Sequence, residues 1–181
     1  YDMILLYYQV WFLSPSIPIN SFLKSEQAKK IMDQTPVITI SGTRNMWFMA
    51  QEKMKVLLQS LNAKLVGNIA LVDHTPNLIS AMTIVNWMFS GVKQRMFNLL
   101  PLPGISENTI KESERFGEII LTSIQNKNYD NLQTNLVQAG AVKVKNFLVS
   151  VDKKGNKMFK IWSKIIENKQ IFLQNYIKNN P

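Results

Sequence analysis

The chain has 181 residues, of which 46% are hydrophobic and 18% charged, and this composition excludes intrinsic disorder and low-complexity architectures. It has no cysteine, which excludes disulfides, thiolate metal sites and a cysteine nucleophile, and its one histidine argues against a histidine-rich metal site, so no metal is expected. The formal net charge is +9 at pH 7, but the first 140 residues sum to only +2, so a general polyanion partner is not indicated.

Strand and helix patterns alternate over the first part of the chain. The residue patterns predict a strand at 3–8, a crossover helix at 18–33, a strand at 37–40, a helix at 46–61 with Asn45 as its N-cap, and a strand at 63–72 with a bulge or an irregular start near Gly67. A further helix is predicted from Ser106, a capping residue, to about 126. Crossovers of more than a dozen residues predict an α/β fold, a three-layer α/β/α domain with a mainly parallel sheet, in which 3–8 and 37–40 are buried strands.

Two regions fall outside this alternation. The insert 74–104 contains an apolar pattern at 78–92, which predicts a helix that is buried or that faces lipid or a lipid-like ligand. The segment 127–181 is predicted to form a C-terminal extension with short strands at 141–145 and 147–151, a turn at 152–156 and a helix at 158–177. The expected organisation is therefore a domain at 1–126 with its insert, followed by the extension 127–181.

Two loops after predicted strands carry a resemblance to a known family. Residues 1–23, with Gln9-Val10-Trp11-Phe12-Leu13-Ser14 at their centre, resemble the third strand, flavin loop and following helix of flavodoxin-like FMN/NAD(P)H oxidoreductases. Ser41-Gly42-Thr43-Arg44-Asn45 resembles their second flavin loop, and 105–124 resembles their terminal helix. Within that superfamily the chain is most similar to the dialkylresorcinol condensing enzymes, through residues 8–16, 43–47, 50–54 and 159–162.

The resemblance implies an FMN-dependent oxidoreductase that acts on a hydrophobic cyclic or aromatic precursor, as in aryl lipid biosynthesis. The family holds the flavin phosphate with a Ser/Thr-rich loop after its first strand. No such loop precedes Tyr1, so we expect the N-terminal portion of the fold to be missing from this sequence. At positions 8 and 9 the chain has Tyr-Gln in place of the family's small turn residues.

The resemblance also implies the residues that contact the cofactor. Aromatic and apolar side chains would cover the flavin ring, while small and polar residues would allow close approach and donate hydrogen bonds. The set is Gln9, Val10, Trp11, Phe12, Leu13, Ser14, Gly42, Thr43, Arg44 and Asn45. The alternative is that Trp11 and Phe12 are loop hydrophobes that cover the sheet edge.

Two side chains are candidates for catalysis. Arg44 could hold an anionic oxygen of the flavin or the substrate, and His74 could carry a proton near neutral pH. The alternatives are a surface arginine beside a helix start and a solvated histidine in a turn. The insert 74–104 is either the lid of an apolar substrate pocket or additional core or an oligomer interface.

The positive charge lies in the extension. Residues 141–181 contain nine lysines against Asp152 and Glu167, a local charge of +7. In the predicted helix 158–177 apolar and aromatic residues share one side and lysines another, a pattern typical of membrane-surface or partner helices. The alternatives are docking onto the missing N-terminal half or onto a second subunit as a homodimer.

Other partners and the location follow from absences in the sequence. Without arginine enrichment or a reader motif, no nucleic acid is expected. Without a signal-peptide pattern or an apolar run of spanning length, a cytoplasmic or peripheral membrane location is expected. Two functions stay open. One is the flavin-dependent oxidoreductase, and the other is a non-catalytic flavodoxin-like module that binds a partner or a membrane. The segment 157–181 is the expected contact with a membrane.

Overall fold

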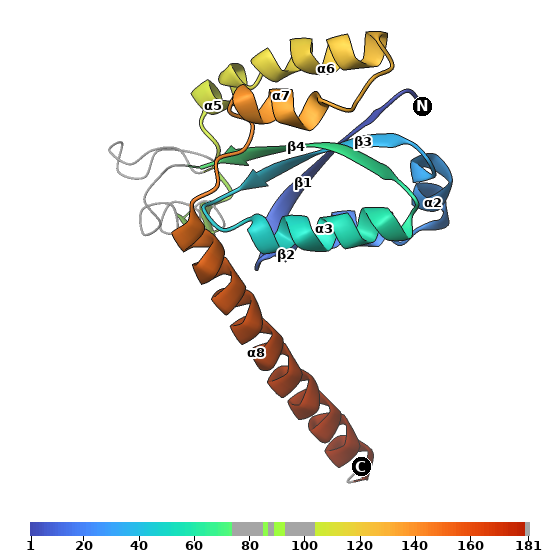
Figure 1. Ribbon diagram of the computed structural model, residues 1–181. Helices are drawn as coiled ribbons and strands as arrows, with labels where there is room; N and C mark the ends of the chain where they lie inside the picture. The colour runs from blue at the N-terminus through green and yellow to red at the C-terminus, as the bar shows by residue number, and fades with distance from the viewer. Residues whose placement is uncertain (74–84, 87–88, 93–103, 180–181) are drawn as a thin grey trace.

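The computed structural model describes residues 1–73, 85–86, 89–92 and 104–179, with side chains up to residue 170. In these residues the chain forms an α/β fold around a four-stranded sheet with the order β2-β1-β3-β4 (Figure 1). Helices cover both faces of the sheet, and one long helix leads away from it. The expected α/β class with a mainly parallel sheet is therefore confirmed.

Three parallel strands lie where the sequence predicts them. They are β1 (Ile4–Trp11), β3 (Pro36–Thr43) and β4 (Lys64–Val72), and the short β2 (Ser14–Pro15) pairs antiparallel with the end of β1. Between β3 and β4 the register shifts at Val37/Ile38, so that Val66 is the extra residue. The bulge expected near Gly67 is thus confirmed.

One layer of helices packs below the sheet as Figure 1 is drawn, and consists of α1 (Ile17–Leu23), α2 (Glu26–Met32) and α3 (Phe48–Ser60). These helices bury a core with β1 and β3, which includes Leu6, Leu23, Met32, Val37, Met54 and Leu58. The prediction of one helix at 18–33 is wrong. The helix stops at Lys24, and the Ser25 hydroxyl accepts a hydrogen bond from the Ala28 N–H, which starts a second helix.

The other layer consists of α5 (Glu107–Glu112), α6 (Arg115–Gln125) and α7 (Leu132–Gln138). Ser106 caps α5 through the Thr109 N–H, as expected, but the continuous helix predicted to residue 126 is interrupted at residues 113–114. The second core, between this layer and β3 and β4, contains Ile38, Ile69, Phe116, Ile120, Leu132, Leu136 and Ala141. The packed core thus continues past residue 126, through α7, to Ala141.

The C-terminal segment forms one helix, α8 (Asn146–Asn179), so the strands predicted at 141–145 and 147–151 and the turn at 152–156 are wrong. The apolar run from Phe147 to Val151 is rich in β-formers, but its burial has a helical spacing. Leu148 and Val149 are half-buried, and Asp152 and Asn156, one and two turns further on, are buried. Tertiary contact on one side of a helix therefore outweighs strand propensity here.

β1 departs from the buried strand that the sequence predicts. Leu5 and Tyr7 are both about half exposed, because α5, α6 and α7 cover β3 and β4 and leave this face of β1 open. On the edge opposite β3, none of the described residues forms a strand beside Ile4–Gln9. The predicted apolar helix at 78–92 lies mostly outside the described residues, apart from helical pairs at 85–86 and 89–90.

Candidate functional site

The candidate site lies at the carboxyl ends of β1 and β3. The two strands are adjacent and parallel, and Gln9 pairs with Gly42 in their register. Loops that follow neighbouring parallel strands meet at one edge of an open α/β sheet, where such sheets bind ligands. The structure therefore brings together the two segments that the sequence singled out, 9–14 and 42–45.

The first segment is a β-hairpin, whereas an open flavin loop was expected. β1 continues to Trp11, the chain turns at Phe12 and Leu13, and β2 pairs back onto the strand. Both turn residues have positive φ, 48° at Phe12 and 58° at Leu13, as in a type I′ turn. This turn type favours Asn and Gly, so two large apolar residues are an unusual choice, and the sequence therefore did not indicate a turn here.

The hairpin divides its side chains between solvent and protein. Trp11 is 42% exposed and Phe12 79% exposed, while Leu13 is buried against the long helix, within 3.0 Å of the point where a Cβ on Gly155 would lie. The Ser14 hydroxyl accepts a hydrogen bond from Lys53 at 2.7 Å, and Val10 is half-buried. Only the side chains of Gln9, Trp11 and Phe12 in this segment are exposed to a ligand.

The second segment is more closed. Gly42 and Thr43 are buried, and the Thr43 hydroxyl donates to the Arg44 carbonyl oxygen at 2.9 Å. The Tyr7 phenol lies where a side chain on Gly42 would be, so this glycine accommodates Tyr7 and leaves no open cradle for a ring. Arg44 and Asn45 are half-buried, and His74 lies outside the described residues.

Asn45 is not the N-cap of α3, contrary to the sequence prediction. The N-cap residue is Trp47, whose side chain makes no capping hydrogen bond. The Asp152 carboxylate, from α8, accepts the Met49 N–H at 2.9 Å instead. A carboxylate 103 positions away in the sequence thus supplies the cap, which local sequence could not reveal.

A groove of about 420 Å³ runs along the open edge of β1 beside the hairpin. The groove is shallow and open to solvent, so it could cover one face or edge of a flat ligand but does not enclose it. No charged side chain lines it, and its walls are mostly aromatic and aliphatic: Tyr7, Tyr8, Gln9, Trp11, Ser16, Pro18, Ile19 and Phe22. Sequence reasoning missed the part of this wall that comes from α1, because Ile19 and Phe22 had the spacing of ordinary core residues.

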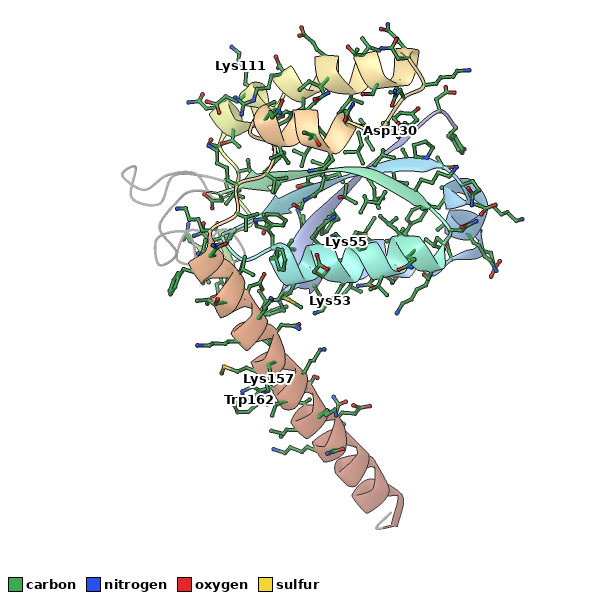
Figure 2. All side chains as sticks on the ribbon, in the orientation of Figure 1. Lys53, Lys55, Lys111, Asp130, Lys157 and Trp162 are labelled. Carbon is green, nitrogen blue, oxygen red and sulfur yellow. The ribbon has the colours of Figure 1, made fainter. Side chains whose placement is uncertain are left out.

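Lys53 joins the hairpin to α3 and α8. Its ammonium group donates to the Leu13 carbonyl oxygen at 3.0 Å and to Ser14, and Figure 2 labels it on α3. Burial lowers the pKa of Lys53, the charge of Lys160 lowers it further, and Asp152 acts in the opposite direction. No local pattern indicates a role for this lysine, since its partners lie about 40 residues upstream and 100 downstream.

A buried polar chain crosses the sheet beneath the site. The Tyr8 phenol donates to the Gln51 side-chain oxygen at 2.7 Å, the Gln51 amide donates to Thr39 at 3.0 Å, and the Thr39 hydroxyl lies 3.1 Å from the Asn68 oxygen. Burial raises the pKa of the Tyr8 phenol well above its ordinary value, and the Ser41 side chain opposes this in part. These hydrogen bonds connect β1, β3, β4 and α3 behind the groove.

No protein-family model matches the chain, and neither the curated proteins nor the solved structures contain a significant match. Within the described residues no group of three His, Asp or Glu side chains is placed to hold a metal ion. Nor does any helix in this part of the chain combine the length and hydropathy needed to cross a membrane.

Proposed function

We propose that this chain binds FMN as a flavin-dependent oxidoreductase with a flavodoxin-like fold, which acts on a hydrophobic cyclic or aromatic precursor, as in dialkylresorcinol or aryl lipid biosynthesis. The observation that carries the proposal is the uncharged aromatic groove at the carboxyl end of β1. Parallel strands in the order β1-β3-β4 with helices on both faces are compatible with such a fold.

The groove fits the ring of a flavin better than it fits the phosphate. Tyr7 and Trp11 offer flat apolar surface, and Gln9 accepts a hydrogen bond from the Trp11 indole at 3.1 Å. This bond fixes the Gln9 side chain and directs its amide nitrogen away from the indole, so that it can donate to a carbonyl oxygen at a ring edge. No cation among the described residues lines the groove, so a phosphate finds no partner there.

When bound, FMN would supply hydride transfer to or from a substrate carbon. The chain's own part is to bind, to orient and to exclude water. Trp11 and Tyr7 would fix the plane of the ring, and the apolar wall from α1 would keep water from its edge. Arg44, at the neighbouring loop, would hold an anionic oxygen, and His74 stays a proposed proton carrier.

Titration of the chain with FMN, followed by quenching of flavin fluorescence, tests the proposal. Trp11→Ala should weaken binding about three- to tenfold, because an aromatic contact is lost. Trp162→Ala is the matched control, since Trp162 is also exposed but lies on α8, away from the groove. Equal affinity in all three proteins would remove Trp11 from the site.

The composition of the groove makes a second test possible. Riboflavin and FMN differ by the phosphate, so the chain should bind both with affinities within about threefold of each other, since the groove carries no charge to distinguish them. If FMN binds far more tightly than riboflavin, a cationic or helix-terminus site outside the groove holds the phosphate, and the expectation that the uncharged groove sets the affinity is wrong.

The second candidate function is a non-catalytic module with a flavodoxin-like fold that docks onto a partner or a membrane. The observation that favours it is α8, whose second half, taken as the part from residue 157 onward, carries exposed apolar side chains and extends away from the sheet. Absence of flavin binding in the titration, together with a functional role for α8, would select this candidate.

A further inference from the structure

The second half of α8 is the largest feature that the flavin proposal does not use. Every residue from 157 to 170 is exposed, and Figure 1 shows the helix leading away from both helical layers. The exposed side chains include Met158, Phe159, Ile161, Trp162, Ile165 and Ile166, each between 46% and 59% exposed. So many exposed apolar side chains on one helix indicate an interaction surface.

These apolar side chains share one side of the helix. At roughly 100° per residue they occupy about 160° of the circumference, and the sequence continues the pattern at positions 172, 173, 176 and 177. Lys157, Lys160 and Lys164 lie on the opposite side, at i, i+3 and i+7. Figure 2 labels Lys157 and Trp162 on this free part of the helix. α8 is therefore amphipathic and basic.

The width and charge of the stripe decide between occupants. In a two-stranded coiled coil with a second copy of the chain, each helix buries only a narrow apolar seam. The apolar stripe of α8 is wider than such a seam, and a second copy would also have to bury Lys169, which lies within the stripe. Between 157 and 179 five lysines stand against Glu167 alone, so the helix is complementary to an anionic surface. Aromatic and aliphatic residues on one side with lysines on the other are the pattern of helices that lie in a bilayer interface.

The candidate site lies next to this helix. The ring of Phe12, at the tip of the hairpin, meets the ring of Phe159 edge-on with 5.9 Å between centroids. Phe12 is itself 79% exposed, so the apolar surface continues from α8 onto the hairpin at the carboxyl end of β1. A bilayer that contacts the stripe would therefore also contact the hairpin.

The first turns of α8 pack against α3 and the hairpin, and these contacts set the direction in which the helix leaves the body. Asp152 caps α3 through the Met49 N–H, and Leu13 packs against Gly155. We infer that α8 lies on the surface of an anionic phospholipid bilayer through its apolar stripe and its lysines, and that it holds the hairpin and the adjoining groove against that surface. This docking does not depend on whether the groove binds a flavin.

Cosedimentation of the full chain with vesicles tests the inference. The chain should bind vesicles of phosphatidylcholine with phosphatidylserine at low salt, bind less as salt rises, and bind phosphatidylcholine alone weakly. The triple variant Lys157→Gln, Lys160→Gln and Lys164→Gln should bind on the order of a hundredfold more weakly. The control removes the same charge from exposed lysines elsewhere, Lys29→Gln, Lys30→Gln and Lys111→Gln, and should bind as the parent does.

A second readout locates the apolar stripe. Brominated lipids should quench the tryptophan fluorescence of the bound chain, and Trp162→Phe should lose part of this quenching while it keeps its affinity, because Trp11 on the hairpin is also exposed to the bilayer. Trp47→Phe, at a buried position, should keep the quenching. Circular dichroism of each variant should show the helix content of the parent, which excludes unfolding of α8 as the cause of a change.

Several outcomes would overturn the inference. The first is a full chain that ignores anionic vesicles at low salt, and the second is an equal loss of binding in both triple variants, which would mean that total charge decides. The third is a dimer that becomes a monomer when Trp162 and Ile166 are both changed to serine, because a second copy would then cover the stripe.

Discussion

Tyr8 shows how a single side chain connects the groove to the stability of the sheet. Its ring lines the groove edge, its phenol is buried and bonded to Gln51, and burial raises its pKa above the ordinary value of about 10. A group whose folded pKa is raised contributes stability that is present below its unfolded pKa. That stability declines as pH rises through and beyond about 10.

We therefore predict that Tyr8→Phe changes the alkaline limb of the stability profile. The free energy of unfolding of the parent should fall by about 1.4 kcal/mol per pH unit above pH 10 from this group, and the variant should lack that contribution. At neutral pH the variant should be about 1–2 kcal/mol less stable, because the Gln51 oxygen loses the shorter of its two hydrogen bonds and keeps only the one from Thr39 at 3.4 Å. Urea unfolding at pH 7, 9 and 11 measures both effects, with Tyr7→Phe, at a half-exposed position of the same strand, as the control.

Phe12 combines an unfavourable backbone conformation with high exposure, and such strain tends to persist where a side chain has a function. Both Phe12→Asn and Phe12→Ala remove the contact with Phe159, but only Asn tolerates positive φ well. We predict that the Asn variant is more stable than the Ala variant by about 0.5–1 kcal/mol. Equal unfolding free energies would show that the hairpin turn is not strained in solution.

Among the elements, α8 is connected to α3 by the buried carboxylate of Asp152. Asp152 is 1% exposed and accepts the Met49 N–H, and nothing in the first turn of α3 itself provides a side-chain cap. We predict that Asp152→Ala lowers the free energy of unfolding by about 1–2 kcal/mol and increases amide exchange in the first turn of α3.

Asp152→Asn is the informative companion variant. It keeps an acceptor for Met49 but loses the attraction to Lys53. Its stability should lie between those of the parent and Asp152→Ala. If Asp152→Ala and the parent unfold alike, the cap contributes nothing, and the packing of the first turns of α8, including the contact between Leu13 and Gly155, holds the helix.

The elements also show what sequence could predict. The strand at Pro36–Thr43 and the helix at Phe48–Ser60 follow from β-branched runs and apolar spacing, which are local signals. The sequence does not predict the hairpin at Phe12, because its turn residues are atypical. It predicts a turn inside the region that forms α8, because glycine at position 155 is typical of a turn. In the structure Gly155 gives room to Leu13, a contact that no local pattern contains.

For the candidate site, too, the sequence predicts which segments meet but not what each side chain contacts. That 9–14 and 42–45 meet follows from the alternation of strands and helices, because parallel strands end at one edge. What each side chain does there could not be predicted. Leu13, Gly42 and Thr43 are buried by partners from distant segments, and the groove gains Ile19 and Phe22 from α1.

At the scale of the whole molecule, the chain divides its length between a packed body and a free helix. The last buried residue in the described part of α8 is Asn156, and side chains from 157 to 170 are all exposed. Burial of apolar surface supplies most of the stability of a fold, so a segment that is exposed throughout and meets the body through the half-exposed Phe159 ring should contribute little to it. The two halves of α8 should then differ in their effect on folding.

We predict that a chain that ends at residue 156 unfolds in urea with the same midpoint as the full chain, to within about 0.5 kcal/mol of stability, since it keeps Asp152 and Gly155. A chain that ends at residue 145 should be less stable by about 2–4 kcal/mol, because it loses the cap of α3 and uncovers Leu13. The shorter helix should also abolish vesicle binding and leave flavin quenching unchanged, so that the two proposals are separated in one protein. A large loss of stability on ending the chain at 156 would mean that the second half of α8 packs on the body or on a second copy in solution, and the membrane proposal would fall with it.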